Sequence, residues 1–300
     1  MQFKNKPVFR AFIPLFALFI LVPLAAIANP GTLENLQYKV TLSETTPGVD
    51  DSLIPGLDPL INVDIQDKLH GTGTRYPLKV YAIQEYFFSD NLLNLITRTS
   101  PKSSVTKPFY GFLQLNLESA SDSRQYDGIR KYYFSSDNRA MIAIFEQGTG
   151  GGAATSSLGL VRWENKPASL GWIYSPANQA NSLKTFQVPD GEIPALEGTV
   201  GWTADSLTAA FVASFTGGQT ATDPGTKTYF LIRVDLGDDG IKIAASPLDA
   251  AALHLSTGST IDKVECSGDL ATLTIISSDG TDTQQVQLPL PSTSTGSSGP

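Results

Sequence analysis

The chain has 300 residues, enough for one large domain or two modest ones. Apolar residues make up 41% and charged residues 17% of the chain, which is typical of a globular, loop-rich protein and argues against a disordered one. The 21 basic and 29 acidic residues give a formal net charge of −8, which argues against nucleic acid as a partner and does not favour docking on anionic lipid.

The first residues predict a secretory signal peptide over 1–28. Three basic residues precede an uncharged stretch, 11–28, that ends in the small residues Ala26-Ile27-Ala28. Cleavage is expected between Ala28 and Asn29. The alternative is an uncleaved anchor, although two prolines interrupt the stretch. Because no other segment is apolar enough to span a bilayer, we expect a periplasmic or secreted protein with no membrane insertion after cleavage.

Residues 29–131 contain several segments with strand character. Apolar and polar residues alternate over 37–42, 61–65 and 112–117, and 78–88 is a further strand candidate. Residues 90–96 are compatible with a short helix capped by Asp90. The region is either a set of degenerate repeats or a small β-rich domain packed on the C-terminal part of the chain.

From residue 132 onward one pattern occurs three times. The stretches 132–144, 200–212 and 264–276 each contain an apolar residue, Ser or Thr, one variable residue, Asp, and then an apolar run. The pattern predicts a turn at Asp137, Asp205 and Asp269, because a short carboxylate there accepts hydrogen bonds from backbone N–H groups between two strands.

The segments after the first two Asp residues are apolar on both alternating faces, namely 140–145 and 209–213. Such strands need cover on both sides. Further strands are expected at 160–164, 231–235, 241–243 and 284–288, with a hairpin turn at 237–240. Each unit therefore predicts a small sheet that must stack against its neighbours.

Radial stacking of four-stranded sheets gives a β-propeller. Residues 132–290 resemble the repeats of TolB-like and WD40-like propeller proteins, whose blades carry a Trp/Phe-Ser-x-Asp turn before an apolar strand. The best matches are 202–205 and 134–137. The units are longer than WD40 blades, and the glycine that customarily follows the Asp is missing. The resemblance implies an all-β, propeller-like stack of about three blades, with residues 29–131 as a possible source of more.

Three blades cannot close a ring, since propellers have at least four. The missing blades would come from 29–131, from a second chain by self-association, or from sequence beyond residue 300. Residues 291–300 contain only Pro, Ser, Thr and Gly and are expected to form a disordered tail or a linker stub. Cys266 is the only cysteine, so no internal disulfide forms, and it is expected to be a small buried hydrophobe.

No catalytic motif accompanies the two histidines, His70 and His254, so the catalytic residues stay unknown. The glycine-rich stretch 148–152 lacks the Lys of a phosphate loop, and the acids Asp235, Asp238 and Asp239 depart from the EF-hand spacing. We expect no metal and no cofactor.

Aromatic side chains are the best candidates for a binding surface. Trp172, Tyr174 and Trp202 are the predicted binding residues, since exposed aromatics bind sugars and peptides. The alternative is that Trp163 and Trp172 fill space between blades. Two functions remain open: a non-enzymatic envelope protein that presents loops to a protein or glycan, or an envelope hydrolase or lyase whose acids gather at the propeller axis.

Overall fold

The computed structural model describes residues 31–44, 61–78, 80–89, 91–99, 109–147, 155–163, 168–175, 193–217, 226–237 and 240–293. The signal-peptide region and its expected cleavage site at Ala28 and Asn29 lie outside these ranges, as does most of the 291–300 tail. The described parts are all-β and contain no helix that is long and apolar enough to cross a membrane.

The strands form five antiparallel units, which we call blades 1 to 5. Blade 1 comprises β1 (Thr32–Glu34), β2 (Tyr38–Glu44), β3 (Ile61–Asp67) and β4 (Thr72–Leu78). Blade 2 comprises β5 (Ala82–Ser89), β6 (Leu92–Arg98), β7 (Tyr110–Asn116) and the first part of β8 (Ser121–Phe134). Residues N-terminal to the repeats thus supply two further blades.

The three predicted units are blades 3 to 5. Blade 3 comprises the second part of β8, β9 (Ala140–Gln147), β10 (Thr155–Arg162) and β11 (Ser169–Tyr174). Blade 4 comprises β12 (Ile193–Trp202), β13 (Thr208–Gly217), β14 (Thr226–Gly237) and β15 (Gly240–Pro247). Blade 5 has only β16 (Thr260–Ser267), β17 (Leu270–Ile276) and β18 (Thr283–Pro289), and a 3₁₀ turn, η2 (Leu255–Thr257), precedes it.

Strand β8 joins blades 2 and 3 into one seven-stranded sheet. Its first part pairs with β7 and its second part with β9, and the register shifts between Ile129 and Lys131. Gly128, at φ +78°, lies at this transition, where a Cβ would stand 2.5 Å from the carbonyl oxygen of Glu146. The boundary between 131 and 132 that separates the predicted domains therefore falls inside a strand.

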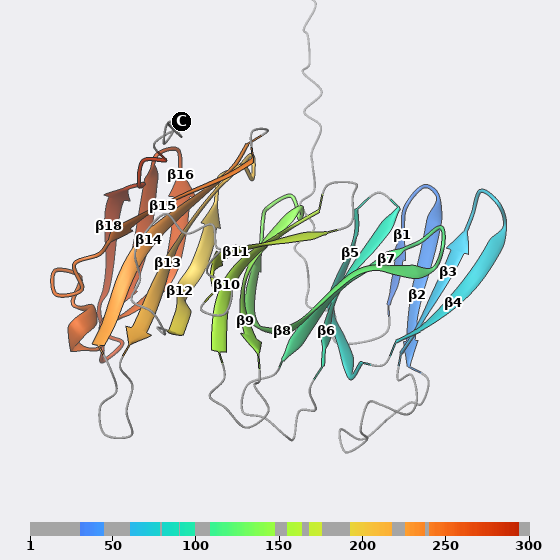
Figure 1. The fold of residues 1–300 in the computed structure, drawn as a ribbon, viewed down its shortest axis with the longest axis horizontal. Helices are drawn as coiled ribbons and strands as arrows, with labels where there is room; N and C mark the ends of the chain where they lie inside the picture. Colours follow the sequence, from blue (N-terminus) through green and yellow to red (C-terminus); the bar gives the residue numbers. More distant parts are fainter. Residues whose placement is uncertain are drawn as a thin grey trace, which may run out of the picture.

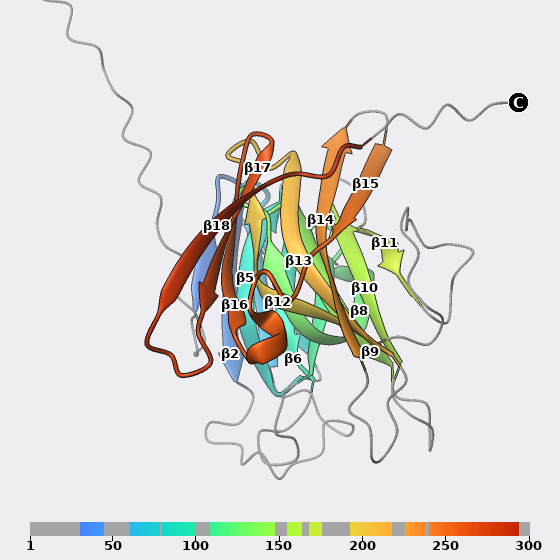
Figure 2. The ribbon, with the colours of Figure 1, turned by 90° about the vertical axis from the view of Figure 1, so that its left-hand side faces the viewer.

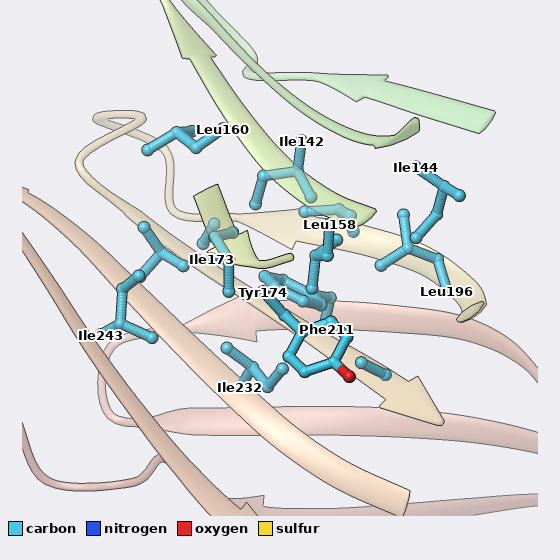
Figure 3. Close-up of a cluster of buried hydrophobic side chains, with 14 of the residues drawn as sticks. Ile142, Ile144, Leu158, Leu160, Ile173, Tyr174, Leu196, Phe211, Ile232 and Ile243 are labelled. Carbon is cyan, nitrogen blue, oxygen red and sulfur yellow. The ribbon is translucent and has the colours of Figure 1, made fainter. Parts of the chain in front are cut away.

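The blades follow one another along the longest axis of the molecule (Figure 1), and Figure 2 shows the row from the blade 5 end. A hydrophobic cluster lies between each blade and the next: one between blades 1 and 2, one between 2 and 3, one between 3 and 4, and one between 4 and 5. The cluster between blades 3 and 4 brings Ile142, Leu158 and Ile173 against Phe211, Ile232 and Ile243 (Figure 3). The fold is a β-propeller-like stack.

The strands predicted to be apolar on both faces have that property. In β9, Ile142 and Ile144 face blade 4, while Met141, Ala143 and Phe145 face blade 2. In β13, Phe211 faces blade 3 and Val212 faces blade 5. Burial on both faces explains why these runs contain no polar alternation.

Residues 92–98 form a strand, not the short helix that 90–96 allowed. All seven residues of β6 are buried, and Ser89 of β5 pairs with Leu92 of β6. A continuous apolar run does not distinguish a buried strand from a helix, and the expected cap Asp90 lies outside the described residues.

The two end blades each have one polar face. In blade 1, Tyr38, Val40 and Leu42 point toward blade 2, while Lys39 and Thr41 point outward. In blade 5, Leu273 and Ile275 point inward, whereas Thr272, Thr274 and Gln285 point outward. Among the described residues, blades 1 and 5 share no hydrophobic cluster and lie at opposite ends of the row (Figure 1). The row is open and has a polar cap at each end.

Candidate binding cleft between the first two blades

The predicted Asp turns differ among the three repeats. At Asp137, the carboxylate accepts hydrogen bonds from Ser135 Oγ (2.6 Å) and the Arg139 N–H (3.1 Å). At Asp205, it accepts hydrogen bonds from Thr203 Oγ1 (2.6 Å) and the Leu207 N–H (3.0 Å). The hydrogen bonds from Thr203 and Leu207 hold the pKa of Asp205 below its usual value.

Asp269 lies in another kind of turn. Ser267 pairs directly with Leu270, so Gly268 and Asp269 form a two-residue hairpin, and the exposed carboxylate accepts a hydrogen bond from Arg233 at 3.1 Å. The turn with the geometry of blades 3 and 4 comes one hairpin later, at Asp279, which accepts from Ser277 Oγ (2.5 Å) and the Thr281 N–H (3.1 Å). In all three of these turns the residue after the Asp has a positive φ: Asn138, Ser206 and Gly280.

The predicted aromatic residues do not form one surface. A bulge at Ile173 places Trp172 and Tyr174 on opposite faces of β11. Trp172 packs on Phe145 between blades 2 and 3, with ring centroids 5.3 Å apart. Tyr174 is 1% exposed and contacts Phe215, and Trp202 is half-buried at the same blade 3–4 cluster. Trp163 is 1% exposed between blades 2 and 3.

The first strands of successive blades contact one another along the row. Tyr132 donates to Glu85 Oε1 (2.9 Å), joining β8 to β5, and Tyr133 donates to the carbonyl of Gly198 (2.6 Å), joining β8 to β12. Thr199 and Val264 exchange hydrogen bonds between β12 and β16. These contacts join the first strands of blades 2 to 5 in series.

Three charged groups on these strands, Lys131, Glu197 and Glu85, are bound by other groups of the protein. Lys131 Nζ donates to the carbonyls of Leu196 and Gly198, both at 2.9 Å, and burial lowers the Lys131 pKa. Burial alone would raise the pKa of Glu197, but hydrogen bonds from Lys227 and Ser214 (both 2.5 Å) lower it. Burial raises the pKa of Glu85 above its usual value, and the hydrogen bond from Tyr132 offsets part of that rise.

In the part of the chain that the structure describes, two hollows lie on blades 1 and 2. The first is a shallow groove of about 640 Å³ on the outward face of β2–β4, where Arg75 Nε lies 2.6 Å from Asp64 Oδ1. The second is a more enclosed cleft of about 330 Å³ between blades 1 and 2, which we call the blade 1–2 cleft. Its lining residues are Tyr76, Pro77, Leu78, Val80, Thr97, Gly111, Phe112, Leu113, Asp122, Gln125 and Asp127.

A bulge in β8 collects the polar side chains of the blade 1–2 cleft. The pairing with β7 shifts by one residue at Ser123, because Gln114 lies opposite Arg124 while Leu115 lies opposite Asp122. The extra residue reverses the alternation, so Asp122 shares a side with Gln125 and Asp127.

These polar side chains lie above an apolar floor. Leu78 and Leu113, both from the cluster between blades 1 and 2, are at most 6% exposed. Asp127 lies directly over Gly111, where a Cβ would stand 2.8 Å from its Oδ1, so this carboxylate position depends on glycine. Gln125 Nε2 is 3.3 Å from both Asp127 oxygens, and Tyr76 donates to Asp122. Burial and the contact with Asp122 raise the pKa of Tyr76 to about 12.

The cleft offers mainly hydrogen-bond acceptors, and nothing in the sequence pointed to it. Tyr76 and Leu78 come from β4, some 45 residues before Asp122, and no motif links the two segments. The bulge in β8 that brings Asp122 to the side of Gln125 also interrupts the alternation of the strand, so the sequence does not show that these residues share a face. Such a cleft suits a ligand with several hydroxyl or ammonium donors and one apolar face.

The other sequence-predicted candidates have structural surroundings. His70 Nδ1 lies 2.7 Å from Asp67, and this contact raises the His70 pKa. His254 is exposed at φ +57°. Cys266 is half-buried against the blade 4–5 cluster, and burial raises its pKa. Asp238, Asp239 and 148–152 lie outside the described residues. Within the described ranges no three His, Cys, Asp or Glu side chains are placed to hold a metal ion.

No protein-family model matches the chain, and no curated protein matches it in sequence. In a comparison of structures the chain is similar to the tricorn protease (8% identity, TM-score 0.35). It is also similar to the β-propeller domain of the Trilobed protease from Pyrococcus furiosus, which has an open velcro topology (7% identity, TM-score 0.35), and to the acylaminoacyl peptidase of Pyrococcus horikoshii (10% identity, TM-score 0.33).

The lengths compared differ widely. The similarity to the tricorn protease covers 83% of this chain and 25% of the protease. The similarity to the Trilobed protease domain covers 88% of this chain and 70% of that domain, and the similarity to the acylaminoacyl peptidase covers 64% of this chain and 27% of the peptidase. The chain therefore spans about a quarter of the tricorn protease and of the acylaminoacyl peptidase. The likeness is too distant to carry an argument about activity. The assignment to the propeller-like class therefore depends on the blades and their order.

Proposed function

We propose that the protein is an exported, non-enzymatic binding protein of the cell envelope, and that the blade 1–2 cleft holds a glycan. The observation that supports this is the lining of the cleft: Asp122, Gln125 and Asp127 above the apolar floor of Leu78 and Leu113. Sugar rings present hydroxyl donors at their rim and C–H groups on their faces, which match these two kinds of lining.

The size of the cleft limits the ligand. At about 330 Å³ it lies at the low end of ligand sites and suits one or two sugar rings rather than a folded protein partner. The likeness of blades 3 and 4 to TolB-like repeats is in keeping with a role in the envelope, as is the predicted signal peptide. Both are sequence-based expectations, and mass measurement of the exported protein tests the cleavage after Ala28.

The experiment is calorimetric titration with a panel of probes: glucose, cellobiose and N,N′-diacetylchitobiose. We expect one of them to bind, and Asp127→Asn to weaken its binding by about tenfold or more, since a hydrogen bond to a charged group is worth about 1.5–3 kcal/mol. Glu118→Gln is the matched control, because it removes the same charge from the exposed β7–β8 turn of blade 2. If no sugar binds, or if Asp127→Asn binds as tightly as the wild type, the glycan proposal is wrong.

A second candidate is an envelope hydrolase or lyase. The observation on its side is Glu85, an acid whose pKa is raised by burial and which is bound by Tyr132, as a general acid would be. Release of reducing ends or unsaturated products from the bound probe, abolished by Glu85→Gln, would favour this function. A ligand that is bound and recovered unchanged favours the binding protein.

A further inference from the structure

We propose that the outer edge of β18 is a dimerisation site, at which the β18 strands of two copies of this chain pair antiparallel. Blade 5 has three strands where each of the other blades has four. Among the described residues nothing pairs with the outer side of β18, which lies at the end of the row (Figures 1 and 2). An open edge is a template for another strand.

The backbone groups on that side can be assigned from the register. The Leu290 N–H donates to the carbonyl of Asp269 and the Ser277 N–H donates to the carbonyl of Asp282, so the even-numbered residues point their backbone groups toward β17. The odd-numbered residues Thr283, Gln285 and Gln287 therefore point N–H and C=O outward. Residues 291–293, the last that the structure describes, lead toward β14, where Thr293 Oγ1 donates to Asp235 (3.0 Å), and do not pair with the edge.

β18 has few of the features that keep other edges from pairing. Its sequence, TQQVQLP, contains no charged residue, its one proline is Pro289 at the last position of the strand, and its pairing with β17 shows no register shift. In contrast, β4 carries Arg75 and Pro77, and β15 carries Lys242. Charges, prolines and bulges are the usual means by which proteins block edge pairing. β11 is also uncharged, but it is the fourth strand of its blade and ends in the buried Ile173 and Tyr174.

A second copy of the same strand fits this edge. In an antiparallel pair about a two-fold axis, Gln285 lies opposite Gln285 of the second copy, and Thr283 lies opposite Gln287 of the second copy. These pairs use every outward N–H. The facing side chains are uncharged amides and hydroxyls, which hydrogen-bond across the strands without like-charge repulsion in a chain of net charge −8. Because β17 occupies the other side of β18, the pairing stops at two copies.

The pairing also covers apolar surface. Val286 and Leu288 are half-exposed at the outer margin of the blade 4–5 cluster. A strand added beside β18 extends the sheet over that margin. The interface is one strand wide, so the association is weak and its detection needs high protein concentration.

The test is sedimentation velocity at increasing concentrations, from about 10 μM to about 1 mM, a range in which weak interfaces form. We expect a reversible monomer–dimer equilibrium. Gln285→Lys and Gln285→Glu each weaken it about fivefold or more, because like charges then lie directly opposite each other. An equimolar mixture of the two variants restores the dimer, because residue 285 faces its own copy.

The control is Thr274→Lys, which places the same charge on the same face of blade 5 but on β17, opposite Gln285 within the sheet. It should leave the dimer unchanged. Three results overturn the proposal: a monomer at every concentration, a dimer that persists in Gln285→Lys, or two single variants whose mixture does not recover association. Thermal unfolding of each variant shows whether a lost dimer reflects a lost fold.

Discussion

The backbone N–H of Asp137 donates a hydrogen bond to Oγ of Ser206, 3.1 Å away, and this bond ties the turn of blade 3 directly to the turn of blade 4. The two residues are 69 positions apart, close to one repeat length. Ser206 is 4% exposed and has a φ of +58°, so its hydroxyl is fixed beside the neighbouring blade. The repeated turns therefore connect blades as well as strands.

Removing that hydroxyl should destabilise the contact between blades 3 and 4. Ser206→Ala removes the acceptor of the Asp137 N–H and should cost about 0.5–1.5 kcal/mol, the usual net contribution of a hydrogen bond that is not fully buried. Ser206→Gly removes the same hydroxyl but relieves the positive φ, so it should cost less than the Ala variant. Urea unfolding measures both. Equal stability of Ser206→Ala and wild type would show that the bond contributes nothing.

Much of blades 3 and 4 could be predicted from sequence, because each short motif there corresponds to one local structure. The two-sided apolar runs in β9 and β13 and the turns at Asp137 and Asp205 are the main cases. Blade 5 shows the limit. Asp269 and Asp279 both stand two residues after a Ser, but Asp269 lies in a two-residue hairpin and Asp279 in the longer turn. In the sequence, the two differ only in loop length and in the glycine at 280.

Blades 1 and 2 were harder to predict, since their turns use other residues. Asn116 Oδ1 accepts hydrogen bonds from the Glu118 and Ser119 N–H groups, and Asp67 closes the β3–β4 turn in a similar way. The blade 1–2 cleft also could not be predicted, because it depends on the bulge at Ser123 and on packing between strands far apart in the chain.

The stability of the protein should fall as the pH decreases from about 4 toward 2. Hydrogen bonds from Ser277 and Thr281 lower the pKa of Asp279 from 3.8 to about 2. Since the folded-state pKa is lower than the unfolded one, the stabilisation is present above the unfolded value and is lost as the pH falls through the folded value. Urea midpoints measured between pH 5 and pH 2 should show this decrease.

Asp279→Asn should lower the urea midpoint at pH 7 and make the acid-induced decrease less steep. Glu118→Gln, which removes an exposed carboxylate, controls for the loss of one negative charge. An unchanged slope in Asp279→Asn would show that this turn does not contribute to the acid sensitivity of the fold.

Gly201 should be essential where β12 approaches β16. A Cβ at this position would lie 2.7 Å from the backbone N of Cys266 and 2.8 Å from the carbonyl oxygen of Val264. Because backbone atoms yield little, Gly201→Ala should cost about 1–3 kcal/mol. Gly73→Ala is the control, since its Cβ would meet only the Ile65 carbonyl oxygen at 3.7 Å, and it should change stability by less than about 0.5 kcal/mol.

A comparison of Gly128 with Gly280 tests two reasons for a glycine separately: a positive φ, and a lack of space for a Cβ. Both have a positive φ, +78° and +74°, but a Cβ at 128 would meet the Glu146 carbonyl oxygen at 2.5 Å, whereas nothing lies within 4 Å of a Cβ at 280. Asn tolerates positive φ better than other residues with a Cβ. Gly280→Asn should therefore cost less than about 1 kcal/mol, while Gly128→Asn should cost about 3 kcal/mol, the same as Gly128→Ala.

The result at Gly128 tests the passage of β8 from blade 2 to blade 3. If the Cβ pushes β8 away from β9, native-state hydrogen exchange should become faster at Ile129 and Phe145, which pair at the transition, while β13 and β14 keep their protection. If Gly128→Asn is clearly more stable than Gly128→Ala, the positive φ alone requires the glycine. The close approach of β8 to the Glu146 carbonyl would then not be the reason that the two halves of the seven-stranded sheet need a glycine where they join.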